Sequence, residues 1–404
     1  MATTLDERAI RRASYAVFAV FALSGFNFAS WAARLPAVQS GLELRKDQMG
    51  LLLFVGAIFS VAALPLSGLV VERLGTRATV WWMATLNVAG LSIAAVSAAL
   101  GQLWGTVLGL VIYGIGTAVW DAAMNLEGAA VEQRLGRTVM PRYHAGFSLG
   151  TVAAAGTSAL AAALHIPIGV HLPLVLALSL AAVGFAVRAF LPREYEPHHV
   201  ESGEHHGGAR GALHAWTERR TLLIGLVVLA AALTEGAAND WVSLAVVDGW
   251  DTPDSFGAVG LAVFVTAMTV MRWFSTRLLD RFGRVSVLRL CAVLSIVGLL
   301  MFGLVGPLWL ALVGVLIWGA GAAVGFPVGM SAASDEPLRA APRVAVVSTI
   351  GYSAFLAGPP LLGFVAEHIG YRNALMLICV PVVMGLLVVK AAAPPDPARP
   401  TLGE

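Results

Sequence analysis

The chain has 404 residues, of which 58% are hydrophobic and only 12% are charged. A soluble domain carries about twice that share of charge, so the composition excludes a soluble domain and indicates an integral membrane protein. The net charge of +2 gives no basis for binding nucleic acid, and the two cysteines, Cys291 and Cys379, lie in apolar runs that make a disulfide framework implausible.

Twelve apolar stretches are long enough to cross a bilayer, which needs roughly 20 apolar helical residues. They are 12–36, 48–71, 78–99, 102–126, 141–164, 169–191, 219–247, 255–278, 284–304, 308–332, 342–366 and 371–391. One long polar segment divides them six and six. We therefore predict an all-α membrane protein with two six-helix bundles at 1–191 and 219–391, a cytoplasmic linker at 192–218 and a cytoplasmic tail at 392–404.

The basic residues are distributed unevenly over the two sides of the predicted membrane. All but four of the 26 Lys and Arg residues fall on the side of the N-terminus. The exceptions are Arg34, Arg45, Lys46 and Arg372. Because cytoplasmic loops carry the excess of positive charge, we expect both termini to be cytoplasmic in a multi-pass protein of the inner membrane.

Several short sequences of the first half recur in the second half at the same offset. The stretch 113–116 (YGIG) matches 318–321 (WGAG), and 146–148 (GFS) matches 351–353 (GYS). Many secondary transporters are built from such an internal repeat, with a substrate site near the membrane midplane where the repeats meet.

A glycine-containing basic motif joins the spans at 48–71 and 78–99. It reads G-x-x-x-D/E-R-x-G-x-R and consists of Gly68, Glu72, Arg73, Gly75 and Arg77, with a shorter counterpart at Asp280, Arg281 and Gly283. Gly75 allows a tight turn, while Glu72 and the arginines can bond helix ends of the opposite half in one conformation, so we predict a conformational switch. With its twelve spans and central polar segment, the chain resembles the major facilitator superfamily over essentially its whole length.

Within that superfamily, the segment from Asp121 to Asn125 is similar to the acidic-Thr-Ala-Ala-Asn segment of the fucose-permease-like proton symporters. His144 falls where that family carries a polar Gln, and Pro36 matches the proline that closes its first span. The acidic residue of that family takes part in substrate binding and proton transfer, so the resemblance implies these roles for Asp121.

The chain departs from the fucose-permease-like pattern at two positions. Ala32 replaces an aspartate of the first span, and Phe147 replaces a second polar residue of the fifth. The chain is closer to a bacterial branch of unassigned substrate, the YbjJ-type permeases, with which it shares Glu235 followed by Gly236.

Asp121 interrupts the apolar span at 102–126, and Asn125 lies on the same helical face one turn later. A carboxylate in a membrane helix costs about 2.5 to 3.5 kcal/mol, so it marks a pathway or a partner. We predict that Asp121 accepts a proton and hydrogen-bonds substrate; the alternative is a structural pair with an arginine or backbone donors of a neighbouring helix. Asn125 is then either its partner at the cavity wall or a helix–helix hydrogen bond.

A second polar cluster lies in the span at 219–247. Glu235 is near its middle, Asn239 follows on the same face, and Asp240 lies further out, where we expect a structural role. We predict that Glu235 is a coupling carboxylate or a substrate ligand, and that the cluster faces Asn27 and Trp31 in the first span.

Three further polar positions lie toward the cytoplasmic ends of the spans. The first is Arg272, the nearest basic candidate for pairing with Asp121 or Glu235. Because it lies toward the cytoplasmic end of its span, neither carboxylate has an obvious basic partner inside the membrane. Glu127 is about 240° around the helix from Asp121 and is expected to pair with cytoplasmic arginines. His144 is either a proton-linked gate or a polar residue at a wet helix end.

Aromatic residues and histidines allow two further interpretations. Trp31, Trp241 and Tyr352 could stack on a ligand, or serve as packing and interface anchors. The histidines of the segment 192–218 could bind a transition metal, but its composition is that of a disordered linker, so we expect no metal. No phosphate-binding loop supports ATP drive, and no nucleophile constellation indicates an enzyme.

These observations together predict a secondary active transporter of a small polar solute, a sugar or a related hydroxylated metabolite. We expect alternating access, symport with protons as the coupling ion, no other cofactor, and a monomer in the lipid bilayer. The alternatives are a proton-driven exporter of amphipathic compounds and a membrane sensor that does not transport.

Overall fold

The computed structural model describes residues 7–136, 139–192, 214–336 and 339–394, which are helical with short connections and contain no strand. The α-helices are α1 (Glu7–Ala32), α2 (Leu35–Gly41), α3 (Lys46–Ala99), α4 (Leu103–Leu135), α5 (Met140–Ala163), α6 (Ile168–Ala186), α8 (Arg219–Trp250), α9 (Asp254–Leu304), α10 (Leu308–Ala322), α11 (Gly325–Ala333), α12 (Ala340–Ile369), α13 (Tyr371–Met376) and α14 (Cys379–Val388). The short 3-10 helices η1 (Val187–Ala189) and η4 (Val389–Ala392) follow α6 and α14.

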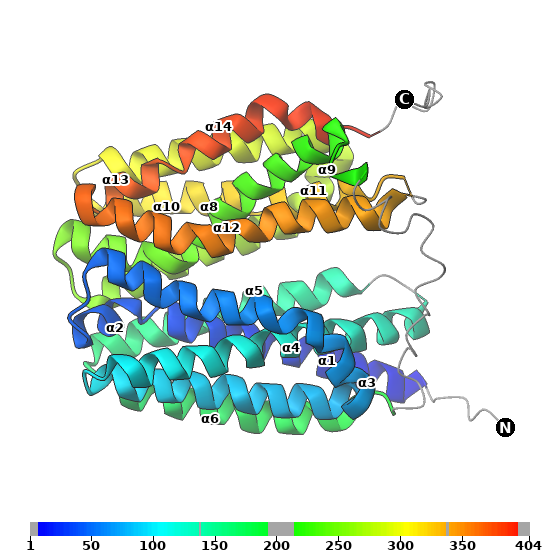
Figure 1. Cartoon of the computed structure of the whole chain (residues 1–404), viewed down its shortest axis with the longest axis horizontal. Helices are drawn as coiled ribbons and strands as arrows, with labels where there is room; N and C mark the ends of the chain where they lie inside the picture. The colour runs from blue at the N-terminus through cyan, green and yellow to red at the C-terminus, as the bar shows by residue number, and fades with distance from the viewer. Residues whose placement is uncertain (1–6, 137–138, 193–213, 337–338, 395–404) are drawn as a thin grey trace. The chain divides into compact units, whose positions relative to one another are not determined.

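Ten helices of the described chain are long and apolar enough to cross a membrane. Two of them, α3 with 54 residues and α9 with 51, are far longer than the roughly 20 residues that one crossing needs. Each is broken at one glycine, Gly75 (φ 80°, ψ 162°) and Gly283 (φ 74°, ψ 164°). Figure 1 shows α3 turning back on itself. The predicted all-α membrane fold is confirmed, and the count of twelve spans follows if the two arms of α3 and of α9 are counted separately.

The chain folds into two compact units. The first contains α1 to α6 with η1, together with residues 239–266 of α8 and α9 and residues 359–371 of α12 and α13; the second contains the other described residues from 214 onward. The predicted linker at 192–218 and tail at 392–404 fall largely outside the described residues. The division into two six-helix bundles stays a prediction.

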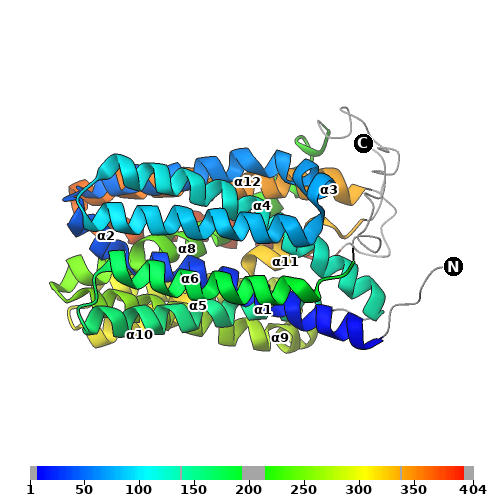
Figure 2. The same ribbon diagram turned by 90° about the horizontal axis from the view of Figure 1, so that it is seen from below.

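Small residues allow close helix contacts in the first unit. Helices α1 and α5 lie side by side (Figure 2), and a Cβ added at Gly150 would lie only 1.8 Å from the carbonyl oxygen of Ala22. The same kind of contact recurs in both halves: a Cβ at Gly90 would lie 2.4 Å from the backbone nitrogen of Tyr113, and one at Gly298 would lie 2.4 Å from that of Trp318. The internal repeat seen in the sequence is therefore also a repeat of backbone packing.

Candidate substrate and coupling site

In the second unit an ion pair joins α8 to α9. Nη2 of Arg272 donates hydrogen bonds to both carboxylate oxygens of Glu235, at 3.0 and 2.9 Å. Nε of Arg272 donates to the carbonyl oxygen of Ala323 at 2.9 Å. Ala323 lies at the interruption between α10 and α11, and the residue four positions later, Pro327, has no N–H to offer. The guanidinium replaces that missing donor and so joins three helical segments.

The expectation that Glu235 lacks a basic partner in the membrane is therefore wrong. The sequence places Arg272 toward one end of its span, but an arginine side chain is long enough to reach a carboxylate more than a helical turn away along a neighbouring helix. The pair is partly accessible, with 32% of the Arg272 side chain and 21% of the Glu235 side chain exposed.

Three aromatic rings gather on α11 and α12. Tyr352 on α12 is 44% exposed and lies between Phe326 and Phe355, with ring centroids 6.0 and 6.4 Å away. Phe355 packs against Gly236, where an added Cβ would lie 2.9 Å from its ring. The prediction that Tyr352 borders a ligand site is compatible with this position.

In the first unit the Asp121 side chain is exposed on α4. Within the described part of the chain its carboxylate makes no hydrogen bond or ion pair, so the structural pairing with an arginine is not observed there. Nδ2 of Asn125 donates to the backbone oxygen of Asp121 at 2.8 Å, and not to the carboxylate.

Asn27 belongs to a buried amide network that links α1, α3 and α4. Its Nδ2 donates to Oδ1 of Asn87 at 3.0 Å, and Nδ2 of Asn87 donates to the hydroxyl of Thr117 at 2.9 Å. Asn27 is fully buried, and its own Oδ1 has no partner among the described residues. Asn87 and Thr117 were missed by the sequence analysis, although a single Asn in an apolar helix is a signal that could have identified them.

The other predicted residues of the first unit are placed less favourably for substrate. Trp31 is 4% exposed and Trp241 is 1% exposed, with the Trp241 ring 5.4 Å from that of Tyr371, so both fit the packing alternative. Asn239 has an enclosed Oδ1 without a partner among the described residues. His144 is exposed and meets Phe21 edge to face at 5.1 Å, and both of its predicted roles, the proton-linked gate and the polar residue at a wet helix end, stay predictions.

The glycine turn of the first half is supported by Glu127. The hydroxyl of Thr76, next to Gly75, donates to Glu127 at 2.6 Å, and the backbone N–H of Leu191 donates to its other carboxylate oxygen at 2.7 Å. Glu127 is fully buried, and these two contacts join the glycine turn to the chain after α6; its predicted pairing with cytoplasmic arginines stays a prediction.

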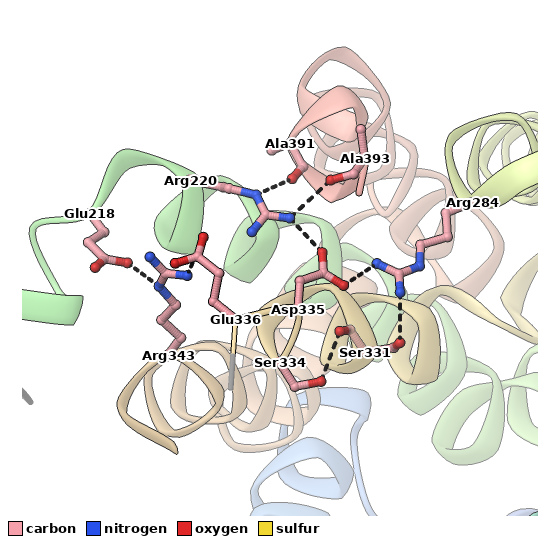
Figure 3. Close-up of polar contacts among 10 residues, drawn as sticks. All are labelled: Glu218, Arg220, Arg284, Ser331, Ser334, Asp335, Glu336, Arg343, Ala391 and Ala393. Carbon is pink, nitrogen blue, oxygen red and sulfur yellow. Dashed lines mark hydrogen bonds and ion pairs between the residues drawn. The ribbon is translucent and has the colours of Figure 1, made fainter. Parts of the chain in front are cut away.

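The turn of the second half is supported by Asp335 (Figure 3). Arg284, next to Gly283, donates to Asp335 at 2.6 Å, and Arg220 donates to its other oxygen at 2.8 Å. Arg220 also donates to the carbonyl oxygens of Ala391 and Ala393, just after α14. The positive φ at Gly75 and Gly283 bears out the predicted tight turns; the predicted switching role of this motif stays a prediction.

A third polar region lies where α3 begins and α8 ends, within the first unit. Nζ of Lys46 pairs with Asp248 at 2.8 Å, and the backbone N–H of Lys46 donates to Glu367 at 2.9 Å. The hydroxyl of Ser243 donates to the carbonyl oxygen of Ala32 at 2.9 Å. These contacts fasten ends of α8 and α12, from the second half of the sequence, to helices of the first half.

A bundle of long apolar helices with an internal repeat, an interrupted helix and polar groups inside it defines a polytopic membrane protein of the transporter type. The Major Facilitator Superfamily model matches residues 16–339 and, in a second match, 252–404, so the chain belongs to this superfamily. The suspected fucose-permease-like branch is not decided by this match.

Curated relatives agree with this assignment. The chain is 29% identical over 366 residues to an uncharacterized transporter, y4wD, of Sinorhizobium fredii, covering 90% of this chain and 93% of the relative. It is 25% identical over 374 residues to the membrane protein MosC of Rhizobium meliloti, covering 92% of this chain and 87% of the relative.

Solved structures share the fold at low sequence identity. The nucleoside transporter NupG superposes with a TM-score of 0.75 at 15% identity, covering 95% of this chain and 98% of NupG. A variant of the Escherichia coli fucose:proton symporter FucP superposes with a TM-score of 0.62 at 14% identity, covering 94% and 98%.

Proposed function

We propose that the protein is a proton-coupled secondary transporter that moves a small polar solute across the inner membrane by alternating access. The solute we infer is a sugar or a related hydroxylated metabolite. The observation that carries the proposal is the partly accessible Glu235–Arg272 pair at the interruption between α10 and α11, among long apolar helices. Such an interruption is where transporter folds place substrate and coupling ions.

Asp121 is the proposed proton carrier. Its carboxylate is exposed on α4 and unpaired within the described ranges, so it can take up and release a proton without first breaking an ion pair. Glu235, held by Arg272, is the proposed second carboxylate of the coupling system. We place both termini in the cytoplasm because most Lys and Arg residues fall on that side of the membrane.

Reconstitution into liposomes tests this function. An imposed pH gradient, acidic outside, should drive accumulation of a solute from a panel of sugars, polyols and hydroxylated acids, and Asp121→Asn should abolish the gradient-driven part. Asp251→Asn, which changes an acid in the connection between α8 and α9, is the matched control and should leave accumulation unchanged. Full gradient-driven accumulation by Asp121→Asn would refute the coupling role of Asp121.

A further inference from the structure

Arg272 has unused hydrogen-bond donors at the point where α8, α9 and the α10–α11 interruption meet. A guanidinium carries five N–H groups in a fixed plane. In Arg272 the Nε group donates to Ala323, and Nη2 donates to both carboxylate oxygens of Glu235. Nη1 has no partner among the described residues, and the side chain is partly exposed. Two N–H groups of a charged donor therefore remain open to an incoming acceptor.

The rings of Phe326, Tyr352 and Phe355 lie on α11 and α12, and Phe355 contacts α8. Phe326 follows the interruption at Ala323 by three residues, and Phe355 packs on Gly236, next to Glu235 in the sequence. Tyr352 lies between these two rings and is the most exposed of the three. Together the rings offer an aromatic surface next to Gly236, the sequence neighbour of Glu235, against which the body of a ligand could pack.

We propose that this place binds the carboxylate of a small ring-containing organic acid, with Nη1 of Arg272 as donor and the three rings against the body of the acid. A charge-assisted hydrogen bond is about twice as strong as a neutral one, so an open guanidinium nitrogen favours a carboxylate over a hydroxyl. The proposal rests on the transport function proposed above. It narrows the expected substrates from hydroxylated solutes in general to those that carry a carboxylate.

Charge balance links this binding to the proton. Among the described residues, Glu235 from α8 and Arg272 from α9 are the charged groups in contact here, while α11 and α12 contribute rings and the Tyr352 hydroxyl. The pair is neutral, so an incoming carboxylate adds one uncompensated negative charge, which is costly in a partly buried place. One proton bound by Glu235 or by the incoming carboxylate restores neutrality. One proton therefore accompanies each monocarboxylate.

Matched acid and neutral probes test the carboxylate site in the purified full-length protein. The pairs are 4-hydroxybenzoate with 4-hydroxybenzyl alcohol, and glucuronate with glucose, each titrated against the melting temperature. We expect an acid to raise the melting temperature at a concentration at least tenfold lower than its neutral partner. Equal responses within the pairs, or no response to either acid, would overturn the proposal.

Variants assign the binding to Arg272. Arg272→Gln should weaken acid binding at least tenfold, and Arg289→Gln, an exposed arginine on the same helix, should not change it. If Arg272→Gln does not fold, Arg272→Lys keeps the charge opposite Glu235 but loses the planar donor set, and should still weaken acid binding several-fold. Acid binding that persists within twofold in both Arg272 variants would refute the site.

Glu235→Gln tests the charge balance, because Gln keeps an oxygen for Arg272 without the negative charge. This variant should bind the acid more tightly than wild type at pH 7.5 and should not gain affinity at pH 6, whereas wild type should. An unchanged pH response in Glu235→Gln would overturn the proton step.

Proteoliposome flux separates this inference from the proposed function. Accumulation of neutral solutes with no binding of acids would leave the transporter in place and remove the carboxylate site. Acid binding that depends on Arg272, without flux of any probe, would keep the site and count against transport.

Discussion

The two glycine turns of the molecule have the same backbone and different side-chain support. Gly75 and Gly283 differ by only a few degrees in φ and ψ. In each half the residue after the glycine bonds an acid 51 residues later, Thr76 to Glu127 and Arg284 to Asp335, and both distances are 2.6 Å. The repeat has therefore kept the position and length of this contact while its donor changed from a hydroxyl to a guanidinium.

Each of the two acids also has a second partner, which connects it to the chain end of its half. Glu127 holds the chain end after α6 directly, through the backbone N–H of Leu191. Asp335 reaches the chain end after α14 through Arg220, which bonds two carbonyl groups there (Figure 3). An acid at this position thus fixes the glycine turn to the last helix of its half in both cases, and Asp335 does so through two arginines.

Asp335→Asn should destabilise the protein more than any other variant of the two glycine turns. The Asp335 side chain is 8% exposed and pairs with two arginines, and removing one partner of a buried ion pair costs about 3 to 5 kcal/mol. A large fall in melting temperature of the purified protein is the expected result. Asp280→Asn, an exposed acid on α9, is the control, and equal effects of the two variants would contradict the role of Asp335.

Glu127→Gln should have a smaller effect. The side-chain oxygen of Gln can still accept one of the two hydrogen bonds, but its NH2 group would face the other donor. This mismatch should lower the free energy of unfolding by about 2 kcal/mol. The melting temperature of this variant should lie between those of wild type and Asp335→Asn. An effect as large as that of Asp335→Asn would mean that the first half depends on charge to the same extent.

Gly283→Ala isolates the backbone part of the comparison. A Cβ at Gly283 would meet no atom within 4 Å, so the cost is the strain of placing alanine at positive φ, about 1 to 2 kcal/mol. Gly156→Ala in α5 also adds a Cβ that meets nothing, but at a helical φ, and should be neutral or slightly stabilising. Equal melting temperatures for the two variants would show that the turn is not strained by a side chain.

Much of this architecture could be predicted from the sequence. Apolar length gives the spans, and the motif around Gly75 and Gly283 gives the turns because only glycine adopts that φ and ψ without cost. Asp121 and Glu235 could be identified as polar residues inside the membrane because a carboxylate is expensive there.

The partners of these residues could not be predicted from the sequence. Which residue faces Asn27 depends on how α1 rotates against α3, and the structure supplies Asn87 where the sequence suggested the span at 219–247. Arg272 reaches Glu235 because its side chain is long and because Pro327 leaves the Ala323 carbonyl without a helical donor. Both facts involve contacts between helices, which periodicity within one helix does not determine.

The smallest expected effect concerns Glu218, another acid of the charged second half (Figure 3). Burial alone would raise the pKa of Glu218, but hydrogen bonds from Arg343 and Thr221 and the charges of Arg343 and Arg339 outweigh it, so its pKa lies below the usual value. The folded state therefore binds this proton less readily than the unfolded state, whose pKa is about 4.3. The stabilisation is complete above that pH and is lost as the pH falls through the lowered folded-state pKa.

The melting-temperature difference between wild type and Glu218→Gln should accordingly stay constant from pH 8 to pH 6 and shrink below about pH 5. Glu43→Gln, an exposed acid in the connection before α3, should show little difference at any of these pH values. A difference for Glu218→Gln that grows on acidification would mean that burial, and not Arg343, decides the proton affinity of this carboxylate. The second half would then owe less of its stability to charge than the contacts of Asp335 and Glu218 with arginines indicate.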